Sequence, residues 1–193
     1  MYRPQAPIGV ILAGGLGRRL GGAKANVELG GRPLISYPLR AMCAALAEVA
    51  IVAKEDTELP AGLGPVPVWI EPPEPRHPLA GIVHALGVAG GRAVLVCAAD
   101  MPLVTPALVS QIAATDPGRA PAVVPSCGGE LQPLLALYLP AAAARLAPAA
   151  TAEGPLRQAV AAIGPHILAI EDPHAFANVN TPEDLARAAA LVA

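Results

Sequence analysis

Apolar residues in the first half of the chain gather in short runs that end at small or polar residues. The runs cover residues 8–13, 48–53, 66–70 and 92–99. The first, IGVILA, has no alternating polar positions, which is typical of a strand buried on both faces of a parallel sheet. The other three runs have the same character, so we expect four buried strands in this half.

Segments with helical spacing separate these runs, at residues 32–47, 78–89 and 105–114. We expect a kink at Pro38, because a proline inside a helix removes a backbone hydrogen bond. Thr105 and Pro106 supply a capping hydroxyl and a proline at the first helical position. Strand and helix therefore alternate, which predicts an α/β fold of three layers around a mostly parallel, Rossmann-like sheet.

The second half of the chain is less regular. Residues 120–125 and 132–139 are strand candidates that lie close together, and we expect an antiparallel excursion there. Alanine-rich helices, a strand at 166–170 and a last helix follow, and Thr181 with the acids after it marks the start of that helix. Repeats are absent from the sequence and its Pro/Gly stretches are interpreted as loops, so residues 1–193 are expected to form a single domain.

Composition narrows the classes of partner. The formal net charge is -2, and the aromatic residues are one Trp, three Tyr and one Phe. A nucleic-acid-binding protein would need a basic patch or a stacking platform, so we expect a small-molecule ligand instead. The N-terminal apolar run is too short for a membrane span or a signal peptide. Cys43, Cys97 and Cys127 have no metal-ligand spacing and are interpreted as reduced thiols of a cytoplasmic protein.

The stretch ILAGGLGRRLGGAK, residues 11–24, places five glycines and three cationic side chains directly after the first strand. The first strand-to-helix loop of an α/β sheet is a common phosphate site, because glycines let backbone N–H groups approach an anion. Leu20 replaces the third glycine of a dinucleotide fingerprint, and Ala23 interrupts the Gly-Lys of a P-loop. The loop therefore indicates another kind of triphosphate site, and the alternative is a solvated turn.

This stretch and the following VELGGRPLI resemble the N-terminal pattern of the MobA-like nucleotidyltransferases. Three more stretches fit in order, EPPEPRHPLAGIVHAL, VCAADMP and AFANVNTPEDL. They resemble the family's base-contacting segment, its metal-binding Asp-x-Pro and its C-terminal Asn-Val-Asn-Thr. Leu-Ala-Gly-Gly with Pro-Leu-Ala-Gly is similar to the molybdenum cofactor guanylyltransferases, whereas the cytidylyltransferases usually carry Leu-Ala-Ala-Gly. The resemblance implies a single nucleotidyltransferase domain with a nucleotide-diphospho-sugar transferase-like fold.

The implied reaction is Mg²⁺-dependent transfer of GMP from GTP to molybdopterin, with release of pyrophosphate. Lys24, Asp100 and Arg19 would be catalytic, and Asp100 would also hold the Mg²⁺. Asn178 and Asn180 would face the acceptor. The product would pass to molybdoenzyme apo-proteins or insertion chaperones. The nucleotide would be bound by Leu12, Ala13, Gly14, Gly15, Gly17, Arg18, Lys24, Glu71, Pro78, Leu79, Ala80 and Gly81.

Position along the chain gives independent support to two of these residues. Asp100 ends an apolar run, so its carboxylate should emerge at the same sheet edge as the glycine loop, and Mg²⁺ takes one or two carboxylates together with substrate phosphates. Glu71 could accept hydrogen bonds from N1 and N2 of guanine. The alternatives are a turn cap for Asp100, a surface-loop acid for Glu71 and ordinary helix caps for the two asparagines.

Two departures from the family keep other functions open. The family usually has Asp where this chain has Ala23, and often has Asp in place of Glu71. A cytidylyl- or guanylyltransferase for another phosphorylated acceptor, and a non-catalytic nucleotide- or cofactor-binding relative, are therefore alternatives. A NAD-dependent oxidoreductase lacks its third glycine here, and the four histidines show no metal-ligand spacing.

Overall fold

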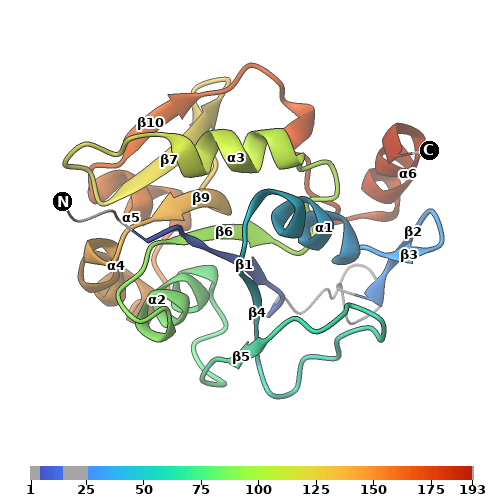
Figure 1. Cartoon of the computed structure of the whole chain (residues 1–193), viewed down its shortest axis with the longest axis horizontal. Coiled ribbons are helices and arrows are strands. Elements are labelled where there is room, and N and C mark those ends of the chain that lie inside the picture. The colour runs from blue at the N-terminus through green and yellow to red at the C-terminus, as the bar shows by residue number, and fades with distance from the viewer. Residues whose placement is uncertain (1–4, 15–25, 193) are drawn as a thin grey trace.

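The computed structural model describes residues 5–14 and 26–192, which build an eight-stranded sheet covered by helices (Figure 1). The strand order is β10-β7-β9-β6-β1-β4-β5, with β8 paired to β7. The sheet strands are β1 (Ile8–Leu12), β4 (Val49–Ala53), β5 (Val68–Ile70), β6 (Val94–Ala98), β7 (Ala122–Cys127), β8 (Glu130–Leu131), β9 (Leu135–Tyr138) and β10 (His166–Ala169). All four strands expected in the first half of the chain are present, but the prediction that all four are buried is wrong for β5, because it lies at the edge of the sheet and Val68 and Ile70 are exposed.

Strand direction decides where a ligand site can form. Strand β1 pairs in parallel with β4 and β6, and β4 pairs in parallel with β5. Strand β9 runs antiparallel to β6 and β7, which confirms the excursion expected in the second half, and β10 then lies parallel to β7. Because β1, β4, β5 and β6 are parallel, their carboxyl ends meet at one edge of the sheet, which is the usual ligand edge of such folds.

Helices cover both faces, so the expected three-layer α/β fold is confirmed (Figure 1). Side chains of α1 and α3 pack on one face, and those of α2, α4 and α5 pack on the other. Both faces of β1 are therefore buried, with Ile11 against the first layer and Val10 against the second. The helices are α1 (Ser36–Ala45), α2 (Pro78–Val88), α3 (Pro106–Ala114), α4 (Ala141–Thr151), α5 (Leu156–Ala162), the 3₁₀ helix η3 (His174–Phe176) and α6 (Pro182–Val192).

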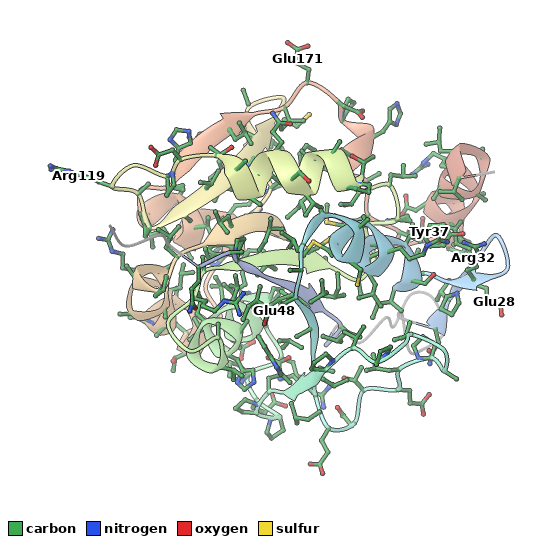
Figure 2. The ribbon with its side chains drawn as sticks, in the orientation of Figure 1. Glu28, Arg32, Tyr37, Glu48, Arg119 and Glu171 are labelled. Carbon is green, nitrogen blue, oxygen red and sulfur yellow. The ribbon has the colours of Figure 1, made fainter. Side chains whose placement is uncertain are left out.

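A small hairpin of β2 (Glu28–Leu29) and β3 (Arg32–Pro33) stands apart from the main sheet, beside α6 (Figure 1). Gly30 and Gly31, with φ of 55° and 75°, form its two-residue turn, a conformation that favours glycine. Figure 2 shows Arg32 and Tyr37 on this side of the molecule, and the Tyr37 hydroxyl donates to the Leu29 carbonyl at 2.5 Å.

The helix expected over residues 32–47 is shorter in the structure, because β3 occupies its predicted start. It begins only at Ser36, so Pro38 lies in its first turn, where a backbone N–H would have no intrahelical acceptor. The prediction of a kink at Pro38 is therefore wrong. Thr105 does cap α3 as predicted, since its hydroxyl accepts from the Leu108 N–H at 3.2 Å. No helix in the described ranges is long and apolar enough to cross a membrane.

Candidate functional site

A cavity of about 180 Å³ lies at the carboxyl edge of β1, β4, β5 and β6, beside the start of α2. Each of these elements contributes side chains or backbone to its wall. The lining residues are Leu12, Ala13, Gly14, Lys54, Glu71, Arg76, His77, Pro78, Gly81, Ala98, Ala99, Asp100 and Leu134. The cavity therefore stands where parallel α/β sheets bind their ligands.

The last residue of β1 and the two residues after it, Leu12, Ala13 and Gly14, line this cavity. The Ala13 N–H donates to the Val52 carbonyl at 2.9 Å, and the Ala99 N–H donates to the Leu12 carbonyl at 3.1 Å. A Cβ atom built on Gly14 would lie only 2.7 Å from Oε1 of Glu71. The Glu71 carboxylate thus occupies the space that a side chain at position 14 would need.

Lys54 and Glu71 form an ion pair inside the protein. Lys54 directly follows β4 and is 3% exposed, while Glu71 directly follows β5 and is 6% exposed. The Lys54 Nζ lies 3.5 Å from Glu71 Oε1, and it donates to the carbonyls of Pro72 at 2.6 Å and Pro75 at 3.3 Å. Two buried opposite charges thus compensate each other, as buried charges require.

The second oxygen of the carboxylate, Glu71 Oε2, is also buried, and it accepts no hydrogen bond from the part of the chain that the structure describes. It lies near α2, because a Cβ built on Gly81 would be 3.5 Å from it. Buried acceptors in proteins almost always have a donor. Oε2 is therefore the atom of the cavity wall that most needs a donor from a ligand.

Arg76 and His77 complete the wall between β5 and α2. The Arg76 guanidinium forms an ion pair with Asp56, and this hydrogen bond lowers the pKa of Asp56 below its usual value. His77 caps α2, since its Nδ1 accepts from the Leu79 N–H at 3.3 Å. His77 thus caps the helix and also lines the cavity.

Asp100 follows β6 and lies across the lining from Glu71, partly exposed. Within residues 5–14 and 26–192, the structure has no group of three or more His, Cys, Asp or Glu side chains that could hold a metal. A single carboxylate fits a Mg²⁺ that takes its other ligands from substrate phosphates and water, which is the usual coordination of Mg²⁺ beside nucleotides. The donor set at this cavity therefore fits that ion.

The two asparagines of the C-terminal motif have different surroundings. Asn178 lines a more open hollow of about 390 Å³ together with Met101, Gln132 and Arg157. Leu134 lines both this hollow and the cavity, so the two are neighbours. The Asn180 N–H donates to the Asp184 carboxylate at 3.0 Å, at the start of α6.

The structure brings most of the predicted residues that it describes into one wall. Leu79 and Ala80, two consecutive residues of α2, do not line the cavity. The Leu79 side chain packs in the core between α2 and the sheet instead. The predicted residues at the cavity are Leu12, Ala13, Gly14, Glu71, Pro78, Gly81 and Asp100. Gly15, Gly17, Arg18, Arg19 and Lys24 lie outside the described residues.

Lys54, Arg76 and His77 line the cavity without having been predicted as ligand-binding residues. The signal for Lys54 was present in the sequence, because it directly follows a buried strand, as Asp100 does, and is one of only two lysines.

Comparisons with known proteins identify the family of the chain. The model of the MobA-like NTP transferase domain matches residues 9–167. A molybdenum cofactor guanylyltransferase of Cereibacter sphaeroides is 36% identical over 189 residues, covering 95% of this chain and 96% of that protein. Another, of Rhodobacter capsulatus, is 37% identical over 188 residues, covering 93% of each.

Solved structures share the fold. Molybdopterin-guanine dinucleotide biosynthesis protein A from Archaeoglobus fulgidus has a TM-score of 0.74 and 24% identity, and the match covers 96% of this chain and 98% of that one. The 2-C-methyl-D-erythritol 4-phosphate cytidylyltransferase from Thermus thermophilus has a TM-score of 0.67 and 25% identity, covering 95% and 97%. The fold is that of the nucleotide-diphospho-sugar transferases, as expected, and the chain belongs to the MobA-like NTP transferase family and is a nucleotidyltransferase.

Proposed function

We propose that this nucleotidyltransferase transfers GMP from GTP to the phosphate of molybdopterin in a Mg²⁺-dependent reaction. The observation that carries the proposal is the buried, acceptor-only edge of Glu71 in the cavity wall, where Oε2 lacks a donor from the described residues. Guanine presents donors at N1 and N2, which suit an ionised carboxylate. The names of the relatives from Cereibacter and Rhodobacter support both the nucleotide and the acceptor.

The rest of the nucleotide would run from Glu71 toward Asp100. Gly14 and Gly81 lie on either side of the Glu71 carboxylate, since a Cβ atom would be 2.7 Å from Oε1 at position 14 and 3.5 Å from Oε2 at position 81, so the two glycines leave room for this carboxylate in the cavity wall. The triphosphate would then reach the carboxyl end of β6 and the glycine loop. In this proposal Arg18, Arg19 and Lys24 of that loop neutralise phosphate charge.

The chemistry is a single in-line displacement. An oxygen of the acceptor phosphate bonds to the α-phosphorus of GTP, the bond from that phosphorus to the bridging oxygen breaks, and pyrophosphate leaves with the electron pair. Asp100 would hold the Mg²⁺, which supplies positive charge to the phosphate oxygens when bound. Lys24 and Arg19 would offset the negative charge that develops on the same oxygens. The reaction needs no covalent bond to the protein.

The acceptor would approach from the hollow beside Asn178. This hollow adjoins the cavity at Leu134, and its Asn178, Gln132 and Arg157 offer polar groups to a ligand with several donors and acceptors. Asn180 lies on the same segment, two residues further along. An acceptor held there would meet the nucleotide near Asp100.

Pyrophosphate release by the purified protein tests the proposal. The protein is incubated with molybdopterin and with GTP, CTP or ATP in turn, each with and without Mg²⁺. We expect pyrophosphate with GTP and Mg²⁺ only, in amounts equal to the dinucleotide formed. Faster release with CTP or ATP would overturn the assignment of the base. Binding of GTP without pyrophosphate release would overturn the assignment of the acceptor.

An Asn178→Ala variant tests the acceptor side separately. Loss of one side-chain hydrogen bond to a ligand should raise the KM for molybdopterin by about tenfold and leave the KM for GTP unchanged. Gln158→Ala, an exposed position of α5 outside the lining of the hollow, is the matched control. An equal rise in both KM values for Asn178→Ala would contradict the placement of the acceptor.

A further inference from the structure

We infer that Lys54 is the positioning residue that sets base selectivity, because it fixes Glu71 as an acceptor-only edge of the cavity. This inference rests on the proposed function, since it takes guanine as the base that Glu71 meets. Nothing in the family resemblance assigns a role to Lys54. Its ammonium group contacts Oε1 of Glu71, and Oε2 is left without a donor from the described residues.

The Lys54 ammonium makes two hydrogen bonds and one ion pair within the protein. The ion pair is with Glu71 Oε1 at 3.5 Å, and the hydrogen bonds reach the Pro72 and Pro75 carbonyls at 2.6 and 3.3 Å. Lys54 is 3% exposed, and these contacts of its ammonium group are with Glu71 and with the segment that follows it. Lys54 therefore acts through Glu71 and the segment after it rather than by touching substrate.

These contacts decide which oxygen of Glu71 meets the ligand. Oε1 is turned toward Lys54 and the backbone of Gly14, whereas Oε2 faces the Gly81 side and lacks a donor from the described residues. An ionised carboxylate can only accept hydrogen bonds, so the edge at Oε2 suits a ligand that donates them. Arg76, in the same wall, adds a second positive charge, although Asp56 compensates it.

An acceptor-only edge discriminates between bases. Guanine offers N1–H and the N2 amino group, which can both donate to Oε2. Adenine has an unprotonated N1 and no 2-amino group, so its ring nitrogen would face a negative charge. Without Lys54, the Glu71 side chain would be free to rotate, so Oε2 would no longer be held where the N1–H and N2 groups of guanine can donate to it. Guanine would lose its advantage.

The test compares GTP with ATP in four proteins: wild type, Lys54→Met, Glu71→Gln and the double variant. Met has nearly the length of Lys and removes only the charge and the donors. We expect the ratio of kcat/KM for GTP over ATP to fall about ten- to hundredfold in Lys54→Met, the range expected for one hydrogen bond to a charged group. The fall should appear in KM for GTP, with kcat little changed.

The double variant separates positioning from direct contact. If Lys54 acts through Glu71, then adding Lys54→Met to Glu71→Gln should leave the GTP/ATP ratio where Glu71→Gln put it. This comparison does not require Lys54→Met to fold, because the double variant has no unpaired buried charge and in Glu71→Gln the Pro72 and Pro75 carbonyls still accept from the Lys54 ammonium. A further change in the ratio would show that Lys54 contacts the nucleotide itself and would overturn the inference.

The control is Arg92→Met, which breaks a more exposed ion pair outside the cavity lining. Arg92 holds both oxygens of Glu48 at 2.8 Å, at the amino ends of β4 and β6, and Figure 2 labels Glu48. Its GTP/ATP ratio should equal that of the wild type. No preference for GTP in the wild type would contradict the proposed function itself, whereas a normal preference that survives Lys54→Met would contradict only the role of Lys54.

Discussion

The backbone N–H of Val179 donates a hydrogen bond of 2.9 Å to the carbonyl oxygen of Asp100. This bond joins two segments that lie far apart in the sequence, the end of β6 and the strand-like segment before α6. It fixes Asn178 beside the wall of the hollow that Met101 also lines. A backbone hydrogen bond thus holds the segment of the carboxylate proposed to bind Mg²⁺ next to the segment of the asparagine proposed to meet the acceptor.

Replacing Asp100 by Asn should abolish most of the activity while leaving the fold intact. The amide has the shape of the carboxylate but lacks its charge, so the ability to hold Mg²⁺ beside the phosphates is lost. We expect kcat/KM for GTP to fall on the order of 100-fold. Calorimetric titration of GTP with and without Mg²⁺ measures the same effect on binding.

Asp116→Asn is the control for this change. Asp116 lies in an exposed turn, where its carboxylate accepts from the Gly118 N–H at 2.8 Å, away from the cavity. It should retain full activity and the same Mg²⁺ dependence as the wild type. Undiminished Mg²⁺ dependence in Asp100→Asn would show that another residue holds the ion.

A methyl group at position 14 should disturb nucleotide binding. The built Cβ of Gly14 lies 2.7 Å from Glu71 Oε1, and Lys54 holds that carboxylate in place, so the two cannot both keep their positions. We expect Gly14→Ala to weaken GTP binding about tenfold or more, since small displacements of binding groups have large effects. Calorimetry gives the dissociation constant.

Replacing Gly87 of helix α2 by Ala should leave GTP binding unchanged, unlike the same replacement at Gly14. A Cβ there would meet nothing within 4 Å, and the position is exposed and helical. Alanine should therefore stabilise the protein by about 0.5–1 kcal/mol without changing GTP binding. If Gly14→Ala also bound GTP normally, the contact between Gly14 and Glu71 would have no role in binding.

The start of α6 should contribute stability that depends on pH. Asp184 accepts hydrogen bonds from the N–H groups of Asn180 and Thr181 at 3.0 and 2.9 Å, and these bonds, the first above all, hold the pKa of Asp184 below its usual value. In the unfolded chain, the pKa of an aspartate carboxyl is about 3.9. Because the pKa of Asp184 is lower in the folded state, these hydrogen bonds stabilise the protein above the pKa of the unfolded chain. Their contribution is lost as the pH falls through the pKa of the folded state.

Urea unfolding of Asp184→Ala from about pH 7 down to about pH 3 measures this contribution. The variant should be less stable than the wild type at neutral pH, and the difference should shrink toward the acid end. Thr181→Ala removes the hydroxyl that accepts from the Asp184 N–H at 3.2 Å, and its cost of about 1 kcal/mol should not vary with pH in the same way. A pH-independent difference for Asp184→Ala would contradict the argument.

Thiol labelling should distinguish the three cysteines. Cys43 is exposed on α1, Cys127 is partly exposed and Cys97 is buried in β6. Burial raises the pKa of the Cys97 thiol, and the nearby Asp100 charge raises it further, so very little thiolate is present there. At about pH 8 we expect Ellman's reagent to modify Cys43 in the native protein and Cys97 only after unfolding. Rapid labelling of Cys97 would mean that β6 opens readily.

The sequence was enough to predict the layers and the parallel half of the sheet, because apolar runs such as 8–13 and 92–99 can be recognised without knowledge of their neighbours. The same reasoning placed Asp100 at the ligand edge of the sheet, since it directly follows an apolar run, whereas Glu71 was predicted from the family resemblance and lines the same cavity. The hairpin at residues 28–33 was missed because two-residue strands are too short to show a period. Its Gly30–Gly31 pair was the available signal.

The role of Lys54 could not be predicted from the sequence. A lysine between a strand and an acidic stretch is ordinarily a solvated side chain, and its distance in sequence from Glu71 gives no indication of contact. Only the pairing of β4 with β5 brings the two residues within 3.5 Å. Leu79 was wrongly predicted to bind the nucleotide for a similar reason. A sequence motif indicates which segment lies near the ligand, but not which of its side chains face the core.

The alignment of β5 on β4 also has a consequence for assembly. Strand β5 is three residues long and lies at the edge of the sheet, so its few ladder bonds specify its position weakly. With Ala53 opposite Ile70, the residues that follow are Lys54 and Glu71. A shift by one residue would turn the carboxylate to the other face and leave a buried ammonium without its counter-ion. The ion pair between Lys54 and Glu71 thus aligns β5 on β4, and the same two residues line the ligand cavity. A sheet with the correct register therefore already has this part of the cavity wall in place.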